Sequence, residues 1–410
     1  MTDAATKPNS KTNPMPESAP LLQSIQLQNF LSFGPNAQTI DLGPLNILIG
    51  PNGSGKSNVI EAISLMRSCP VPTSSRGDSS LVSVVKRGGG VEEWIWKGDP
   101  TTPARITTVF ERFDGEEPLH HGIEFATERQ RFHLTGEFVA RDTADSEPSE
   151  TNFFYGYTKD GHFINVAKEN QPRQLTEETI EANVSILAQR NDPEQYPEIS
   201  YLTRQYGKVA IYREWAFGRN TILRRAQSVL DRSDWLEEDF SNLFLFLNQL
   251  SQNPKTKRLL LERLRDIYEE VTDISFEIIS QFVRFSLVEN DYRIPCERLS
   301  DGTLRYLCLL AILCDPTPPP LICIEEPELG LHPDILPKIA DLLVAASERT
   351  QLIVTTHSDI IVDSLTDQPE SVFVVEKHDG QTTVKHPPAL APGERLGTAW
   401  IEGRIGGTRW

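Results

Sequence analysis

An apolar run that leads into a glycine-rich octapeptide constrains this chain more than any other feature. The run, residues 45–49, is followed by Gly50-Pro51-Asn52-Gly53-Ser54-Gly55-Lys56-Ser57 and then by a helix-like segment from Asn58. This spacing, between a predicted strand and a predicted helix, is that of the P-loop, whose N–H groups surround phosphate oxygens at a helix N-terminus. A ligand-free glycine turn is the alternative, but the flanking strand and helix disfavour it. The sequence predicts an α/β core that binds a nucleoside triphosphate, with Lys56 on the β- and γ-phosphates and Ser57 on Mg²⁺.

Composition describes a soluble globular protein. Of 410 residues, 38% are hydrophobic and 24% are charged, so the chain can form two or three domains or one domain with an insertion. No apolar stretch approaches the ~18 residues that span a bilayer. Residues 1–20 lack the apolar centre of a signal peptide, so we expect a disordered leader and a cytoplasmic protein. The five cysteines have no CxxC spacing, so we expect buried thiols rather than a metal site.

The formal net charge of −18 disfavours a uniformly basic surface for nucleic acid. Any contact with DNA would therefore use a local patch. One candidate is residues 204–232, where seven basic residues face two acidic ones; it includes Arg213, Arg219, Arg224 and Arg225. A second basic cluster covers residues 255–265. Two interpretations stay open for both: solvated helix faces with intramolecular ion pairs, or a track for the phosphate backbone.

Hydrophobic periodicity separates strand-rich from helix-rich parts. Strands are predicted at residues 24–30, 45–49, 94–96, 106–113 and 131–138, with a loop over 70–90 and a polar break at 141–151. Helical periodicity appears at residues 181–190, 222–230, 236–250 and 257–271, and strands alternate with helices after residue 274. No segment sustains the ~3–4 heptads of a long coiled coil.

We therefore expect an α/β P-loop fold with a mixed central sheet, an antiparallel β-subdomain and a helical lobe inserted after the P-loop. The expected parts are a leader (1–20), the first half of the nucleotide-binding lobe with the β-subdomain (21–175), the helical lobe (176–275), the second half of the nucleotide-binding lobe (276–390) and a tail (391–410). The tail combines aromatic and basic residues with glycines. It either docks a partner or packs on its own domain.

The predicted strand at residues 321–324 ends in two adjacent carboxylates, Glu325 and Glu326. At the carboxyl end of a strand, both side chains can reach the nucleotide crevice. One acid can then support Mg²⁺ while the other polarises the water that attacks the γ-phosphate. We expect Glu325 on the metal side and Glu326 as the general base. A Glu-Glu pair alone is typical of a protein surface, but this pair follows an apolar run in a chain with a P-loop.

A second anion-binding helix start is predicted at Leu299-Ser300-Asp301-Gly302-Thr303. The Ser300 hydroxyl and the N–H groups near Gly302 would face an anion at this N-terminus. One nucleotide site needs only one such cradle, so the spare one suggests a nucleotide held by another copy of the chain. In isolation, the pentapeptide is also an ordinary N-cap sequence.

A further buried strand, residues 352–355, ends at Thr356-His357-Ser358. His357 could hydrogen-bond a γ-phosphate oxygen or the attacking water. A single histidine after a strand usually has a structural role. The position of His357 after the three other motifs favours a role in the nucleotide site instead.

Together these motifs resemble an ABC-type ATPase head of the branch that contains RecF and the structural-maintenance-of-chromosomes (SMC) proteins. The Walker A sequence GPNGSGKS, the signature LSDGT, the Walker B sequence LICIEE, the following PELGLHP and the TTHS switch carry the resemblance. The opening LQNFLSFG is similar too. The pattern is close to the ATPase half of overcoming-lysogenization-defect (OLD) proteins.

The resemblance implies an ATPase that forms a head-to-tail homodimer through ATP. Gly50 to Asn58 would bind ATP with Mg²⁺, and Ser300 and Gly302 would contact the γ-phosphate held by the partner. Glu325 would support the metal, Glu326 would be the general base, and His357 would be the switch histidine. Residues 328–332 would form the D-loop across the dimer. Gln189 would be the Q-loop residue that senses Mg²⁺.

Three positions depart from the pattern of this branch. The signature reads SDGT instead of SGGQ, the Walker B acid is Glu325 instead of Asp, and Leu31 stands where relatives often carry a basic residue. These departures predict slow turnover and put one phosphate contact, at Leu31, in doubt.

Two functions fit these motifs. The first is an ATPase that drives or gates DNA processing in genome maintenance or phage defence. Only 53 residues follow His357 (410 − 357), too few for a nuclease domain, so a separate nuclease or other effector is expected. The second is an ATP-held scaffold that regulates an effector and hydrolyses slowly or not at all. A small-molecule kinase leaves LSDGT unexplained, and the long insertion after Ser57 disfavours a transporter ATPase.

Overall fold

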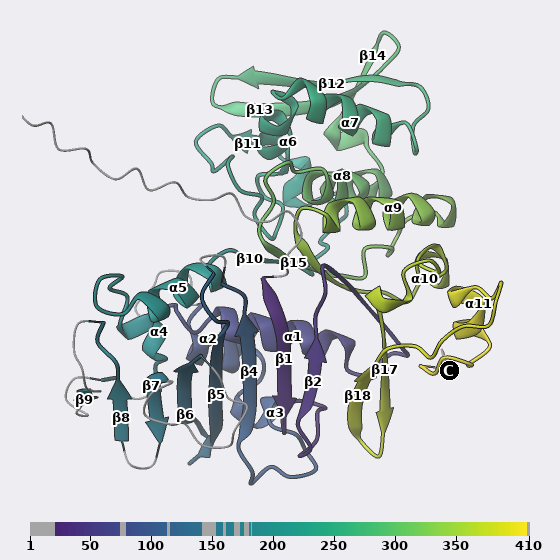
Figure 1. Ribbon diagram of the computed structural model, residues 1–410. Coiled ribbons are helices and arrows are strands. Elements are labelled where there is room, and N and C mark those ends of the chain that lie inside the picture. The colour runs from purple at the N-terminus through teal and green to yellow at the C-terminus, as the bar shows by residue number, and fades with distance from the viewer. Residues whose placement is uncertain are drawn as a thin grey trace, which may run out of the picture.

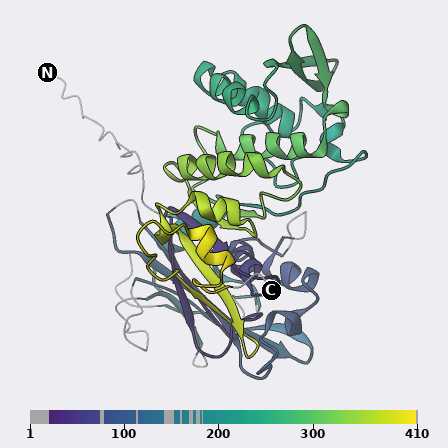
Figure 2. The same ribbon diagram turned by 90° about the vertical axis from the view of Figure 1, so that its right-hand side faces the viewer.

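The computed structural model describes residues 21–73, 79–112, 115–141, 153–158, 161–167, 173–175, 180–181 and 183–407. These residues form two lobes (Figures 1 and 2). In the view of Figure 1, the lower lobe contains two large sheets, and the upper lobe contains helices and a smaller sheet. The predicted leader at 1–20 lies outside the described residues, as does the polar break except for Arg141.

A six-stranded mixed sheet forms the centre of the molecule. Its strands, in spatial order, are β10 (Val209–Tyr212), β15 (Leu321–Glu325), β16 (Gln351–Thr355), β3 (Leu45–Ile49), β17 (Val372–His378) and β18 (Gln381–Lys385). All neighbours are parallel except β17 and β18, which form a hairpin. Parallel strands place their carboxyl ends at one edge, and that edge carries the motifs described below.

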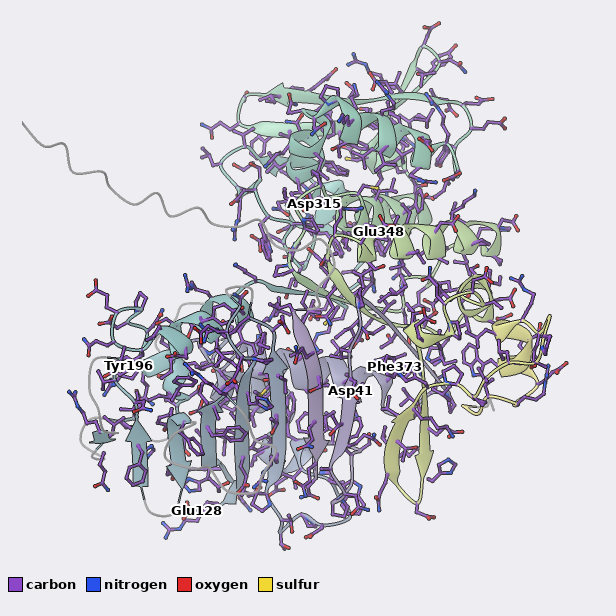
Figure 3. All side chains as sticks on the ribbon, in the orientation of Figure 1. Asp41, Glu128, Tyr196, Asp315, Glu348 and Phe373 are labelled. Atoms are coloured by element: carbon purple, nitrogen blue, oxygen red, sulfur yellow. The ribbon has the colours of Figure 1, made fainter. Side chains whose placement is uncertain are left out.

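The central sheet is apolar because both of its faces are covered. Ile47 and Ile49 of β3 pack into the core that is formed with the upper-lobe helices, whereas Leu48 packs into a second core on the opposite face. This alternation follows the period of two of a strand. The second core includes α1 (Lys56–Arg67) and the antiparallel sheet. Phe373 of β17 belongs to it (Figure 3).

The antiparallel β-subdomain is an eight-stranded sheet beside the central sheet (Figure 1). Its strands, in spatial order, are β2 (Gln38–Asp41), β1 (Leu22–Gln28), β4 (Ala104–Phe110), β5 (Leu119–Glu128), β6 (Arg131–Ala140), β7 (Phe153–Thr158), β8 (Gly161–Ile164) and β9 (Arg173–Leu175). The accompanying helices are α2 (Leu81–Arg87), α3 (Val91–Trp94), α4 (Ile186–Gln189) and α5 (Pro197–Tyr206).

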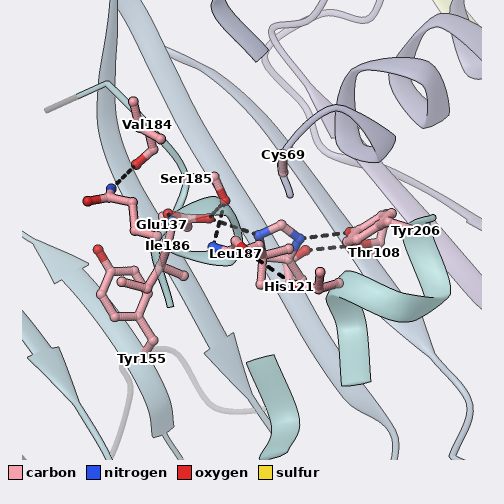
Figure 4. A network of polar contacts seen from close by, with 12 residues as sticks. Cys69, Thr108, His121, Glu137, Tyr155, Val184, Ser185, Ile186, Leu187 and Tyr206 are labelled. Carbon is pink, nitrogen blue, oxygen red and sulfur yellow. Dashed lines mark hydrogen bonds and ion pairs between the residues drawn. The ribbon is translucent and has the colours of Figure 1, made fainter. Parts of the chain in front are cut away.

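A buried polar network joins this sheet to α4 and α5 (Figure 4). His121 of β5 contacts the Tyr206 hydroxyl at 2.7 Å through Nδ1 and Glu137 of β6 at 3.1 Å through Nε2. Glu137 also accepts hydrogen bonds from the Ser185 hydroxyl and the Ile186 N–H. The His121 and Glu137 side chains are completely buried. Paired polar groups in the core therefore fix these helices on the sheet.

The upper lobe combines four helices with a four-stranded antiparallel sheet (Figure 1). The helices are α6 (Leu243–Ser251), α7 (Pro254–Leu264), α8 (Asp301–Leu313) and α9 (Leu336–Ser347), and the strands are β11 (Gln227–Ser228), β12 (Val271–Ile279), β13 (Phe282–Glu289) and β14 (Tyr292–Pro295). Two short helices, α10 (Asp359–Ser364) and α11 (Leu396–Ile401), pack beside the central sheet. No helix in the described ranges is longer than the 13 residues of α8.

Two predictions near the N-terminus are wrong. The segment 94–96 is not a strand: α3 ends at Trp94, and Ile95 makes only an isolated bridge with Phe30. The segment 70–90 is not all loop, because α2 lies within it and buries Leu81 and Val85. Their spacing of four residues places both side chains on one face of a helix.

The part predicted as a helical lobe is a mixture of helices and strands. It supplies β10 to the central sheet and β11 to the upper-lobe sheet, and β12 begins within it. The segment 222–230 is not a helix: a 3-10 turn, Ile222–Arg224, precedes β11, and Leu230 is 80% exposed. The predicted helix at 181–190 is limited to α4. Pairing of β11 with β13 overrides the local helical period.

Two smaller expectations are testable in the described residues. All five cysteines lie there and are buried and free, as predicted. Within the described ranges, no helix combines the length and hydropathy that a membrane span requires.

Candidate nucleotide site

The P-loop has the strand–loop–helix geometry that the sequence predicts. It connects the end of β3 to α1, with φ of 150° at Gly50, 75° at Gly53 and 107° at Gly55. A Cβ at Gly50 would collide with the Val375 carbonyl oxygen, and one at Gly55 would collide with the Thr382 and Ser32 hydroxyl groups. Glycine is therefore required here by backbone conformation and by close packing.

Lys56 is the buried cation of this loop. Its Nζ donates hydrogen bonds to the carbonyl oxygens of Gly50 at 2.8 Å and Pro51 at 3.0 Å. Burial lowers the pKa of Lys56 to about 8, while the carboxylates of Glu326 and Glu328 oppose this shift. An ammonium group with reduced hydration, close to two acids, is ready to exchange carbonyl partners for phosphate oxygens.

The cradle fits a triphosphate and its metal. Gly55 is the N-cap of α1 and has no side chain to satisfy the first N–H groups, which have no acceptor within the helix. The Ser54 Oγ is buried without a hydrogen-bond partner among the described residues, and Ser57 is exposed on the first turn. Asn58 donates to the Ser32 Oγ at 2.6 Å. The Ser54 hydroxyl and the first N–H groups of α1 thus lie where the phosphates of a nucleotide would bind.

The two acids of the Walker B motif meet this edge from β15. Burial raises the pKa of Glu325 to about 7; Arg213 opposes the shift, and Glu61 and Glu326 add to it. A bound cation would offset this unfavourable burial of charge. Glu326 has φ of 45°, an uncommon conformation for a residue with a side chain, and its N–H donates to the Thr355 carbonyl at 3.0 Å.

The structure brings His357 to Glu326. His357 follows β16, the neighbour of β15, and its Nε2 lies 3.2 Å from Glu326 Oε1. Glu328 supports the same turn, because its Oε1 accepts hydrogen bonds from the Thr356 hydroxyl and the His357 N–H. Burial raises the pKa of Glu328, and these two hydrogen bonds oppose the shift. The carboxyl ends of adjacent parallel strands therefore unite an acid, a histidine and a supporting carboxylate.

The signature residues lie in the upper lobe, at the start of α8 (Figure 1). Ser300 is the N-cap, and its Oγ accepts a hydrogen bond from the Thr303 N–H at 3.0 Å. A Cβ at Gly302 would lie 3.2 Å from the Gly330 carbonyl oxygen, so the signature packs on the turn after Walker B. The structure shows the ordinary N-cap and does not place Ser300 on the phosphate cradle of its own chain.

Gln189 is not brought to this edge, and its proposed Q-loop position is wrong. Its side-chain amide hydrogen-bonds the backbone of Glu181 and Val184, in the segment that precedes α4. The segment after β10 lies at the edge instead. Arg213 pairs with Glu61 of α1 at 2.8 Å, and the Trp215 indole donates to the Glu325 carbonyl oxygen at 2.7 Å.

Sequence reasoning missed Arg213 and Trp215 as site residues, although a signal exists. The apolar run Val209–Tyr212 is followed directly by charged residues, as the Walker B run is. The surrounding helical period hid this short strand.

Two arginines of the proposed DNA track serve the fold. Arg213 pairs with Glu61, and Arg224 contacts Asp301 at 2.6 Å and the carbonyl oxygens of Cys296 and Leu299. For Arg213 and Arg224, these contacts favour the interpretation as intramolecular ion pairs over a track for the phosphate backbone. Arg219 and Arg225 are exposed.

Two comparisons of sequence bear on identity. Residues 45–363 match the model of a family described as "AAA domain, putative AbiEii toxin, Type IV TA system". The chromosome partition protein Smc of Desulfitobacterium hafniense is 33% identical over 113 residues, 26% of this chain and 8% of the relative. That of Rhodopirellula baltica is 27% identical over 128 residues, 30% of this chain and 10% of the relative. The matches thus span only a small part of the relatives' length.

Solved structures show the same fold. An Smc head bound to the C-winged helix domain of ScpA aligns with a TM-score of 0.56 at 15% identity, over 89% of this chain and 97% of that one. An Smc head with an extended coiled coil, bound to the C-terminal domain of ScpA from Pyrococcus furiosus, gives 0.51 at 13% identity, over 90% and 96%. The predicted SMC-like P-loop fold is therefore confirmed. Since the family model spans most of the sequence, this chain belongs to the family described as AAA domain, putative AbiEii toxin, Type IV TA system.

Proposed function

We propose that this protein is a Mg²⁺-dependent ATP hydrolase that works as a head-to-tail dimer and drives or gates DNA processing through a separate effector. The main observation in favour of a hydrolase is that Glu326 and His357 lie together at the sheet edge that also carries the P-loop. Glu326 Oε1 and His357 Nε2 are 3.2 Å apart. Family membership and the Smc-head fold support ATPase activity in general terms. The resemblance to OLD proteins adds phage defence as the proposed setting.

The residues divide the chemistry among them. Glu326 would accept the proton of the attacking water, and His357 would orient that water or the γ-phosphate from the adjacent turn. Lys56 would leave its two carbonyl partners for the β- and γ-phosphates. Ser57 and Glu325 would hold Mg²⁺, which supplies charge neutralisation on the phosphates when bound.

A groove beside the P-loop is our proposed nucleoside site. It is lined by residues that include Leu31, Ser32, Asn58, Trp96 and Lys377. Asn58 belongs to the first turn of α1, where the phosphates would end, so the nucleoside would continue into this groove. Leu31 offers an apolar surface there where a basic residue was expected. A purine between Leu31 and the Trp96 ring would bury apolar area without a phosphate contact from Leu31.

The dimer accounts for the second helix start. Ser300 and Gly302 lie in the upper lobe, whereas the P-loop lies in the lower lobe (Figure 1). A head-to-tail arrangement would bring the α8 N-terminus of one chain to the γ-phosphate held by its partner. The solved Smc heads are bound to parts of ScpA, which supports the proposal that a head of this fold works with another protein.

Turnover and nucleotide binding, each measured with and without DNA, test the function. Wild-type protein should hydrolyse ATP only with Mg²⁺ and faster with DNA, whereas Glu326→Gln should bind ATP with similar affinity and lose at least about 100-fold in kcat. Tight ATP binding without turnover in either protein would replace the hydrolase with the ATP-held scaffold. Phosphate transfer to a small acceptor would contradict both.

A further inference from the structure

Glu328 is a half-buried acid whose role the proposed reaction leaves open. It follows Glu326 by two residues, on the turn after β15, and its Oε1 accepts two hydrogen bonds from the turn after β16. The donors are the Thr356 hydroxyl at 2.7 Å and the His357 N–H at 2.6 Å. Its Oε2 is buried and has no hydrogen-bond partner in the described part of the chain. Burial of a half-paired carboxylate is unfavourable, so a merely structural turn would gain little from this residue.

The contacts of Glu328 close a ring around the reacting groups. The chain runs from Glu326 through Pro327 to Glu328, Glu328 holds the backbone of His357, and the His357 imidazole returns to Glu326. Both turns end neighbouring parallel strands, and backbone hydrogen bonds extend as far as the N–H groups of Glu326 and Thr356, whereas the His357 N–H donates to the Glu328 side chain. Glu326 also has φ of 45°, which costs about 1–2 kcal/mol for a residue with a side chain and requires support from its surroundings.

We propose that Glu328 is a positioning residue that holds His357 at Glu326, and that it does so within its own chain rather than across the dimer. This inference rests on the proposed ATPase function and assigns Glu328 a task there. The D-loop role expected from the resemblance would instead point Glu328 at a partner. The two hydrogen bonds to Thr356 and His357 commit its Oε1 to its own switch turn.

Two substitutions of Glu328 separate its role as a hydrogen-bond acceptor from the effect of its negative charge. Glu328→Gln keeps an oxygen that can accept from Thr356 and His357, whereas Glu328→Ala removes it. We expect Glu328→Gln to keep kcat within about 3-fold of wild type, and Glu328→Ala to lower kcat at least about 10-fold with KM for ATP changed less than about 3-fold. Rescue by the conservative variant and a loss in kcat alone are results that general destabilisation would not give.

Asp315→Ala is the matched control. Asp315 is a buried acid that also supports a turn, since its Oδ1 accepts from the Thr317 N–H at 2.9 Å. It lies at the base of the upper lobe, before β15 (Figure 3). This variant should lose stability but keep kcat. If Glu328→Ala does not fold, Thr356→Val, which removes one of the two donors, should lower kcat by a smaller factor.

A spectroscopic measurement keeps the test independent of turnover. Histidine-selective NMR of the ligand-free protein should show the His357 imidazole signal moved in Glu328→Ala, and unmoved in Glu328→Gln and Asp315→Ala. A wild-type protein without ATPase activity would contradict the proposed function. The NMR signal would still test whether Glu328 positions His357. An unmoved His357 signal with wild-type kcat in Glu328→Ala would overturn the inference, as would equal losses of kcat in Glu328→Ala and Glu328→Gln.

Discussion

At the scale of single residues, the protonation of Glu325 makes stability depend on pH. Burial raises its pKa from 4.5 in the unfolded chain to about 7, so the folded state keeps the proton to higher pH than the unfolded state does. The stability of the metal-free protein should therefore fall as pH rises from about 5 to about 7. Allowing for solvent at this partly exposed group, we expect a contribution of about 1–2 kcal/mol.

Chemical denaturation in EDTA of wild type and Glu325→Gln checks this prediction. The two proteins should have similar stability near pH 5, and the variant should be the more stable one at pH 8. A wild type that gains stability relative to the variant as pH rises would show that the carboxylate is favoured in the fold, contrary to its burial.

Two glycines of the P-loop should respond differently to the same substitution. A Cβ at Gly55 would collide with Thr382 and Ser32 at φ of 107°, whereas one at Gly53 would meet open space at φ of 75°. Gly53→Ala should cost about 1 kcal/mol of backbone strain, and Gly55→Ala about 2–3 kcal/mol because packing is added. Equal thermal unfolding shifts in the ligand-free proteins would contradict the packing assigned to Gly55.

The residues found from sequence share one property. Lys56, Glu326 and His357 each follow a buried apolar strand, so alternation and strand ends were enough to bring them to one edge. Arg213 and Trp215 follow a strand of only four residues inside a helix-rich segment, and Gln189 was placed by resemblance alone. The pairing of β10 with β15 brings Arg213 and Trp215 to the nucleotide edge, and the local sequence pattern does not predict this tertiary pairing.

At the scale of elements, the His121–Glu137 pair connects the antiparallel sheet to α4 and α5. Glu137→Gln should destabilise the protein by about 3 kcal/mol, because it leaves buried partners with mismatched donors. Tyr206→Phe, which removes one hydroxyl from the same network, should cost about 1 kcal/mol.

Thermal and urea unfolding of both variants give these values. ATP affinity should be little changed in either, since Glu137 lies in the antiparallel sheet rather than at the P-loop (Figure 4). A Glu137→Gln variant as stable as wild type would show that the network contributes no net stability. The contact between His121 and Glu137 could not be predicted from the sequence, because it depends on the pairing of β5 with β6 and on the position of the short helix α4.

At the scale of the whole molecule, Arg219 and Arg225 are the two exposed members of the four arginines proposed to contact DNA. If the proposed DNA contact uses them, the double variant with glutamate at both positions should lose DNA stimulation and keep basal turnover. The salt dependence of DNA binding should weaken by about 0.9 in log–log slope for each bond to a phosphate that the substitutions remove. Lys338→Glu, on the exposed side of α9, is a charge-reversal control that matches the charge change of each single substitution.

Stimulation that survives the double variant and disappears in the control would move the DNA surface to the upper lobe. The fold class was predictable at this scale, because the P-loop, the two carboxylates and the histidine each follow an apolar strand, although the spatial order of these strands, β15-β16-β3, differs from their order along the chain. The sequence did not predict that residues 176–275 are divided between the two lobes, because this division depends on the pairing of β10 in the central sheet.

The central claim is that two chains share each nucleotide, and mixing two inactive variants tests it most directly. Lys56→Ala removes the phosphate lysine, and Ser300→Arg blocks the signature serine. In a mixed dimer, the P-loop of the second variant meets the signature of the first, so one intact site forms. An equal mixture should recover about a quarter of wild-type turnover, because half of the dimers are mixed and each has one of two sites. If both variants fold and bind as expected and the mixture stays inactive, or if Ser300→Arg alone hydrolyses ATP at the wild-type rate, the shared site is contradicted.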